Sequence, residues 1–136
     1  MINNLKRLFK LNDGEIVKYA DLATVEVGKW HSLHASLTET QGNKLNKDVW
    51  YKRFDTKKPG QLIFIARIFK GSGFHYHSHD CKETITPING NVTVNDKRVL
   101  NNDESYTFFA NTKHKVHYHS SDNDEYLDVF VEFNKR

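Results

Sequence analysis

The stretch from residue 71 to residue 90, GSGFHYHSHDCKETITPING, constrains the fold and chemistry of this chain more than any other. His75, His77 and His79 stand at alternating positions, and Glu83 follows four residues after the last of them. Side chains of an extended strand share a face at every second residue, so the three histidines would point the same way. Imidazole and carboxylate ligands suit first-row divalent metals such as Zn, Fe, Mn, Ni or Cu. The spacing predicts an inward-facing metal site, and a solvated histidine-rich loop is the alternative.

The spacing of this stretch resembles the first motif of the cupin superfamily. Gly71 is followed by five residues and then His77, by one residue and then His79, by three residues and then Glu83, and by six residues and then Gly90. The motif is matched at each of its fixed positions. The resemblance implies that His77, His79 and Glu83 are three ligands of a metal ion.

Residues 109–114, FANTKH, stand where the second cupin motif would lie. By resemblance, His114 falls at the place of the fourth metal ligand. Phe109 replaces the usual Pro and Asn111 the usual Gly, and Tyr118 stands where an Asn often follows the histidine. Asn tolerates the left-handed backbone conformation better than other residues with a side chain, so the turn can keep its shape.

Three further residues are candidates for the second shell or the pocket of such a site: His75, Tyr118 and Arg67. His75 shares strand parity with His77, but a register that used these two as ligands would leave Glu83 two residues too far away. Tyr118 shares strand parity with His114.

Arg67 interrupts the apolar run over residues 62–70, and its role depends on the face to which it points. Inward, it could hold an anionic substrate through a bidentate contact, whereas outward it would be an ordinary edge charge. Cys81 is the single cysteine and lies in the middle of the first motif. A thiolate ligand is one reading, and a place in the connecting turn is the one that the resemblance implies.

Short strand patterns separated by turn signals run through most of the chain. They predict strands over residues 30–37, 49–54, 62–70, 82–88, 91–94, 97–100, 105–109, 114–119 and 126–133. Asn89-Gly90 is typical of a two-residue hairpin, which would pair the strands on either side of it. Many short strands with regular turns favour an all-β sandwich or barrel, and the double-sheet jelly roll of the cupins fits this pattern.

We therefore predict a single cupin domain over residues 1–136, a double-stranded β-helix or jelly-roll barrel with its core over about 49–133. The apolar spacing of residues 2–10 predicts a short amphipathic helix at the N-terminus.

Composition and charge narrow the classes of partner. The formal net charge of +3 has no basic stripe behind it, which argues against nucleic acid. No stretch approaches the roughly 20 apolar residues of a membrane span. A lone cysteine forms no internal disulfide, which fits a reducing compartment, and we expect a cytoplasmic protein.

Two functional hypotheses of different class follow from the resemblance. The first is an enzyme of dioxygenase or isomerase type that uses a divalent transition metal (Fe, Mn, Ni or Zn) to act on a small organic molecule. The second is a non-catalytic cupin that binds a small ligand or metal as a sensor. The resemblance also implies a homodimer, for which residues 49–54 and 62–69 could supply the interface.

Overall fold

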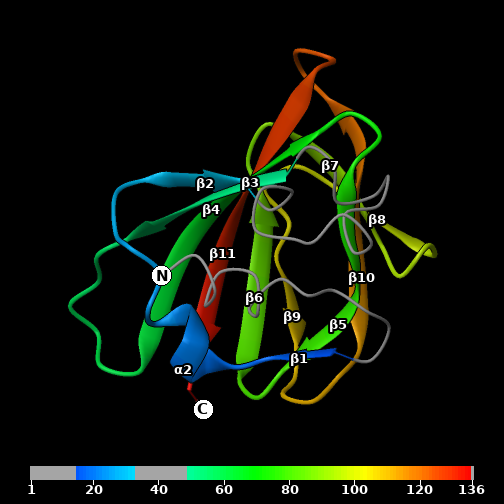
Figure 1. Cartoon of the computed structure of the whole chain (residues 1–136). Helices are drawn as coiled ribbons and strands as arrows, with labels where there is room; N and C mark the ends of the chain where they lie inside the picture. Colours follow the sequence, from blue (N-terminus) through cyan, green and yellow to red (C-terminus); the bar gives the residue numbers. More distant parts are fainter. Residues whose placement is uncertain (1–14, 33–48, 136) are drawn as a thin grey trace.

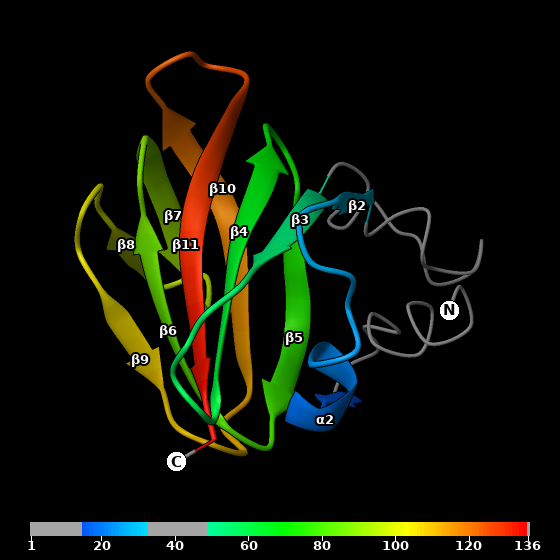
Figure 2. The same cartoon turned by 90° about the vertical axis from the view of Figure 1, so that its left-hand side faces the viewer.

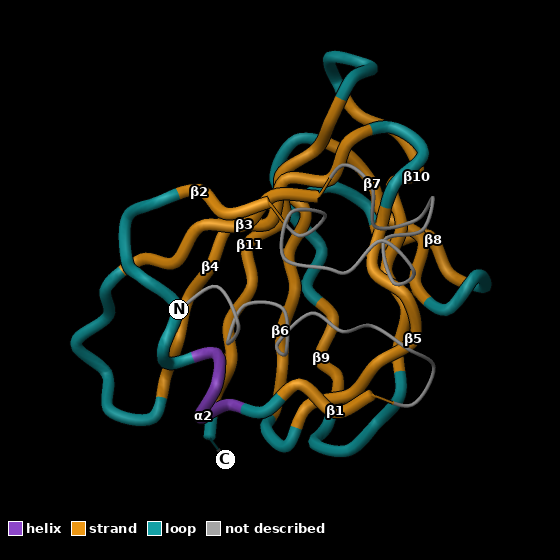
Figure 3. Tube along the Cα trace, in the orientation of Figure 1, coloured by secondary structure: helices purple, strands orange, loops and turns teal. Residues whose placement is uncertain are grey.

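The computed structural model describes residues 15–32 and 49–135. The expected helix over residues 2–10, and the part of the expected first strand beyond residue 32, lie outside the described residues. Within the described ranges the chain is almost entirely strand and turn, with one short helix, α2 (Tyr19–Leu22) (Figure 3). No described helix is long and apolar enough to cross a membrane.

The strands form two sheets that face each other (Figures 1 and 2). The five-stranded sheet consists, in spatial order, of β1 (Glu15–Val17), β5 (Gly73–His79), β10 (His114–Ser121), β7 (Gly90–Val94) and β8 (Arg98–Leu100). The six-stranded sheet consists of β2 (Trp30–Ser32), β3 (Val49–Phe54), β4 (Gln61–Phe69), β11 (Tyr126–Asn134), β6 (Lys82–Pro87) and β9 (Tyr106–Phe108).

These two sheets confirm the predicted all-β jelly roll, with one correction. No described strand of one sheet pairs with a strand of the other, so the architecture is an open sandwich and the barrel is not closed by backbone pairing. The core lies between the sheets, where each strand turns its buried face toward the facing sheet.

Buried and half-buried residues alternate along the two central strands, and this shows which face of the six-stranded sheet packs into the core. Every second residue of β4 and of β11 is buried, and the two strands pair along their whole length. The buried residues of β4 are Leu62, Phe64, Ala66 and Ile68. Burying such an aliphatic or aromatic side chain contributes about 1.5–3 kcal/mol, so this register places Arg67 on the outer face.

A bulge in β5 breaks the alternation that the sequence suggests for the histidines. His77 pairs with His114 and Phe74 with Val116, so three steps along β5 oppose two along β10. Phe74 and His77 consequently both line the interior although they differ in parity. The strict alternation expected along this strand is therefore interrupted between residues 74 and 77, while His77 and His79 both belong to the same buried cluster. The side chain of His75 lies outside what the structure describes.

Asn89-Gly90 is not the hairpin that its sequence predicts. β6 before it pairs with β11 and β9, whereas β7 after it pairs with β10 and β8, so the dipeptide carries the chain from one sheet to the other. Neither residue has the positive φ that a type I′ turn requires. Asn89 instead accepts a hydrogen bond from the backbone N–H of Asp128 at its Oδ1 atom, 2.7 Å away, which ties the crossing to β11.

The true two-residue hairpin is formed by Asn95 and Asp96 between β7 and β8. Their φ angles are 55° and 57°, as a type I′ turn requires, and the N–H of Lys97 donates to the carbonyl of Val94. The expectation that Asn111 adopts the left-handed conformation of a glycine also agrees with the structure, which gives it a φ of 65°.

Two glycines that lie close in sequence are expected to respond differently to substitution by alanine. A Cβ at Gly73 would stand 2.5 Å from the carbonyl oxygen of Val116 and 2.7 Å from Cα of His117, which are backbone atoms of β10. Gly73→Ala should lower the free energy of unfolding by about 3 kcal/mol, because the strand pair must open to admit the methyl group. Gly71→Ala meets no atom within 4 Å, and its positive φ should cost about 1 kcal/mol. Chemical denaturation of both variants checks this order, and an equal or reversed loss would contradict the close approach at Gly73.

Candidate metal centre

Four buried side chains converge between the two sheets. His77 and His79 come from β5, Glu83 from β6 and His114 from β10. One potential ligand atom of each lies within 4.8 Å of those of the other three. The four residues to which the cupin motifs point are thus brought together in space.

Strand pairing explains how residues distant in sequence meet here. His77 and His114 are register partners across β5 and β10. β6 buries every second residue starting at Glu83, and this places the carboxylate opposite the histidines from the other sheet. Each sheet therefore supplies part of the cluster.

Two backbone carbonyls fix the tautomers of the histidines. Nδ1 of His79 lies 2.8 Å from the carbonyl oxygen of Val17, and Nδ1 of His114 lies 2.9 Å from that of Thr112. A carbonyl only accepts, so Nδ1 carries the proton and donates in both rings. The Nε2 atom of each ring is then left with its lone pair toward the cluster, as metal-binding histidines are commonly held.

The side-chain nitrogen and oxygen atoms that face one another in the cluster do not form hydrogen bonds with one another. Oε1 of Glu83 lies 2.7 Å from Nε2 of His114 and 3.4 Å from Nε2 of His79. None of these three buried atoms has a hydrogen-bond partner in the described structure, and with the proton on Nδ1 neither Nε2 atom has a hydrogen to donate to the carboxylate. Unsatisfied buried polar atoms are costly. Three imidazole nitrogens and one carboxylate oxygen are a donor set that fits a first-row divalent metal.

The cluster also shifts the acidity of its carboxylate. Burial alone would raise the pKa of Glu83, but the adjacent imidazoles of His79 and His114 favour the carboxylate form and hold that pKa well below its ordinary value. Glu83 is accordingly ionised near neutral pH, which is the form that binds a metal.

Aromatic rings hold two of the imidazoles in place. Phe108 stacks on His114 with ring centroids 4.0 Å apart and an interplanar angle of 10°. Phe133 meets His79 edge to face at 4.8 Å. The ring positions are therefore set by packing as well as by hydrogen bonds.

A cavity of about 60 Å³ adjoins the cluster. Its walls come from both sheets and from the segment that contains β1 and α2, which contributes Val17 and Leu22. Sequence reasoning missed this segment. The contacts that matter there are a backbone carbonyl and two ordinary aliphatic residues, which leave no recognisable pattern in the sequence.

Arg67 does not line the cavity, so of the two placements that the sequence leaves open the structure has the outward one, and Arg67 is not a pocket residue. Its guanidinium makes a bidentate contact with Asp128, with Nε to Oδ1 at 2.8 Å, on the outer face of the six-stranded sheet. It also lies over the rings of Trp30 and Tyr126, 4.9 Å and 4.3 Å from their centroids. Arg67 is therefore a surface residue whose charge is paired with Asp128 and packed against two aromatic rings.

Arg67→Ala is expected to affect stability alone. Loss of the ion pair and of the cation–π contacts should lower the free energy of unfolding by about 1–2 kcal/mol. Metal content should stay unchanged, because Arg67 faces away from the cavity. Urea denaturation and elemental analysis check the two parts, and loss of metal in this variant would contradict the outward placement.

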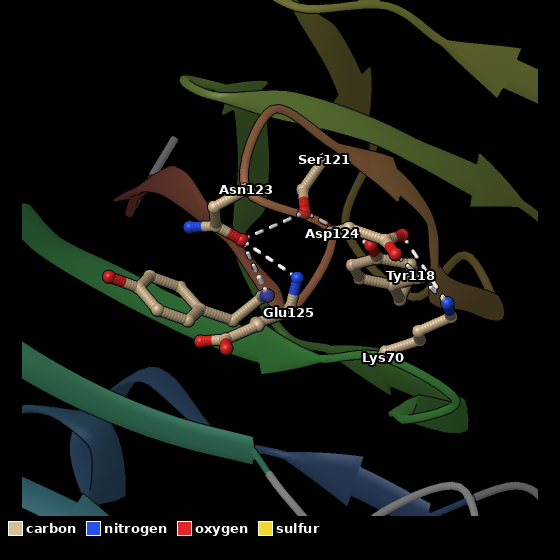
Figure 4. Close-up of polar contacts among 7 residues, drawn as sticks. Lys70, Tyr118, Ser121, Asn123, Asp124 and Glu125 are labelled. Atoms are coloured by element: carbon tan, nitrogen blue, oxygen red, sulfur yellow. Dashed lines mark hydrogen bonds and ion pairs between the residues drawn. The ribbon is translucent and has the colours of Figure 1, made fainter.

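Tyr118 and Cys81 also lie apart from the four clustered residues. Figure 4 shows Tyr118 near the turn between β10 and β11, where its hydroxyl lies 3.0 Å from Oγ of Ser121, and it is not among the described residues that line the cavity. In the same turn, Oδ1 of Asn123 accepts a hydrogen bond from the N–H of Glu125 (Figure 4).

Cys81 is buried, and burial, with smaller contributions from nearby carboxylates, raises its pKa to about 12. A thiol held protonated in this way is a poor metal ligand.

Solved structures with a similar fold include cupins. A cupin-like protein from Thermotoga maritima aligns with a TM-score of 0.54 and 18% identity, over 65% of this chain and 69% of that one. A cupin 2 conserved barrel domain protein from Leptotrichia buccalis aligns with a TM-score of 0.54 and 21% identity, over 65% of this chain and 42% of that one. The polyketide cyclase RemF from Streptomyces resistomycificus aligns with a TM-score of 0.55 and 9% identity, over 66% of this chain and 67% of that one.

This chain therefore spans less than half of the Leptotrichia protein and about two thirds of the other two. No protein-family model and no curated protein matches the sequence. At these identities the likeness concerns the fold.

Proposed function

We propose that this chain, whose fold is that of the cupins, is a metal-dependent enzyme of dioxygenase or isomerase type that acts on a small organic molecule. The observation that carries the proposal is the buried cluster of His77, His79, Glu83 and His114, set beside a cavity. A polyketide cyclase among the fold neighbours supports it further, because it is an enzyme on this architecture. Fold alone does not determine function, so the proposal rests on the site.

The histidines and the glutamate of the cluster would contribute to the binding of a divalent ion in different ways. Nε2 of His79 and of His114 are presented by rings whose Nδ1 atoms are bound to backbone carbonyls. Glu83 would neutralise one of the two charges of the ion. A bound ion supplies Lewis-acid polarisation of an oxygen donor, and a redox-active ion supplies electrons as well.

The walls of the cavity would protect this chemistry from bulk water. Most of the residues around the cluster are buried and apolar, and Phe108 and Phe133 cover the faces and edges of the imidazoles. A low-dielectric surrounding strengthens the interaction between a metal and a polar substrate group.

A binding protein without turnover is the second candidate. It is favoured by the lining of the cavity, in which the described residues include no acid or base besides the cluster itself and the hydroxyl of Tyr51. General acid–base catalysis would need a group within hydrogen-bond reach of the substrate. Saturable binding of a small ligand without product would support this second function.

Elemental analysis of untagged protein, purified without a chelating column, tests the proposal. We expect about one equivalent of iron, manganese, nickel or zinc, as a site of three or four protein ligands holds. Turnover is then tested with the metal-loaded protein by oxygen uptake and product analysis on a panel of small organic molecules. Protein without metal that also takes up none on reconstitution would overturn the proposal. Bound metal without turnover would support the binding protein instead.

A further inference from the structure

The size of the cavity limits what it can hold. Its volume of about 60 Å³ is well below the roughly 300–1,000 Å³ of a pocket for a drug-sized ligand. A molecule of a few non-hydrogen atoms fits, whereas a nucleotide or a sugar chain does not.

The lining of the cavity is apolar apart from the cluster. Beyond the three histidines, Glu83 and Tyr51, every described lining residue is aliphatic or Phe. Ile68, Ile85 and Val129 are typical, with at most 2% of their surface exposed. The described lining includes no Lys, Arg, Asn, Gln, Ser or Thr, so the cavity offers little to hydrogen-bond a polyhydroxylated ligand.

Among the residues that the structure describes, the cations Arg67 and Lys115 have carboxylate partners outside the cavity. Arg67 pairs with Asp128 on the outer face of the six-stranded sheet. Lys115, next to His114 on β10, points away from the cavity and contacts Asp96 with its Nζ atom at 2.8 Å. A second charge on a ligand in the cavity would therefore find no oppositely charged partner among the described lining residues, which is strongly unfavourable for a buried charge.

The charge of the metal-loaded cluster limits the charge that a ligand can carry on its head group, the polar end that would meet the ion. Three neutral histidines and one carboxylate around a divalent ion leave one formal positive charge. A single anionic or neutral oxygen donor matches that charge, and a dianion does not.

We propose that the ligand of this site is a small molecule with one oxygen-donor head group on a short apolar chain, and that dicarboxylates, sugars and phosphorylated compounds are excluded. This inference rests on the proposed metal-dependent function and names its substrate class. It follows from the juxtaposition of a polar cluster with a small cavity that is otherwise apolar.

Titration of cobalt-loaded protein with simple carboxylates tests the inference, with the visible Co(II) absorption as readout. Acetate, propanoate, butanoate and pentanoate form a series in which only the apolar chain grows. Each added CH₂ should lower Kd about fourfold until the cavity is full, as expected for burial of one methylene. Succinate, which adds a second charge at the far end, should bind at least about 100-fold more weakly than butanoate.

Two substitutions in the cavity wall should shift the preferred chain length in opposite directions. Ala66→Leu fills the cavity and should weaken pentanoate binding at least about tenfold while leaving acetate within about twofold. Val131→Ala enlarges the cavity and should move the optimum to a longer chain. The melting temperature and cobalt content of each variant show that the fold and metal site are intact, and the second variant keeps the test informative if the first does not fold.

The outcomes separate this inference from the function on which it rests. Protein that takes up no cobalt overturns the metal-dependent function and this inference with it. Protein that holds cobalt but binds succinate within tenfold of butanoate, or shows no dependence on chain length, overturns this inference alone. A rising series with weak succinate binding supports both.

Discussion

Glu83→Gln and His114→Ala are each expected to remove the metal from the protein. Glu83 is the only anionic group of the cluster, and His114 presents an Nε2 atom that lies 2.7 Å from the carboxylate. Loss of an outer partner of a metal ligand typically costs 10–100-fold in affinity, so loss of a ligand itself should cost at least about 100-fold. Elemental analysis after gel filtration should then give less than about a tenth of an equivalent for each variant.

The matched control for this experiment lies on the same strand. His119→Ala removes an exposed histidine of β10, five residues beyond His114 and outside the cluster. Its metal content should equal that of the parent protein. Full occupancy in Glu83→Gln and His114→Ala, or equal loss in all three variants, would show that the metal is held somewhere else.

Removal of the metal is expected to lower the melting temperature by about 10–20 °C. An ion that binds only the folded state adds about 4 kcal/mol to its stability when its free concentration is a thousand times Kd. For a chain of 136 residues, the usual unfolding entropy converts this free energy into a shift of that size. The effect should be large because the cluster contains three unsatisfied buried atoms that the ion would satisfy.

Scanning calorimetry with and without a chelator measures this shift. Glu83→Gln provides the control, since a variant without the site should melt at the same temperature under both conditions. A chelator that leaves the parent protein unchanged would contradict a stabilising ion at this site. A chelator that shifts the parent protein and the variant equally would place the stabilising ion elsewhere.

Local sequence patterns were enough to predict most of the described strands, although not β1, and the grouping of the cluster. The predicted strand over residues 49–54 agrees with β3, and the expected strand over 62–70 differs from β4 by one residue at each end. His77, His79, Glu83 and His114 meet as the cupin spacing implies. These features depend on periodicity and spacing, which survive in a single sequence.

Features that depend on the partner of a strand could not be predicted in this way. Asn89-Gly90 has the composition of a hairpin, but the strands that it joins find other neighbours. The bulge in β5 is visible only in its register with β10. The side on which Arg67 lies followed from the pairing of β4 with β11, because the apolar run around it fits either face.

Because the site needs the parallel pairing of β1 with β5, we expect its completion to be a late event in folding. Val17 lies 62 positions before His79, whose imidazole it orients, and His114 lies on β10, which pairs with the other edge of β5. Closing loops of this length costs entropy before any contact compensates for it. A nascent chain cannot present all four residues of the cluster until β10 has been synthesised and has paired with β5. If the cluster binds an ion, we therefore expect binding only in chains in which β1, β5 and β10 have already paired.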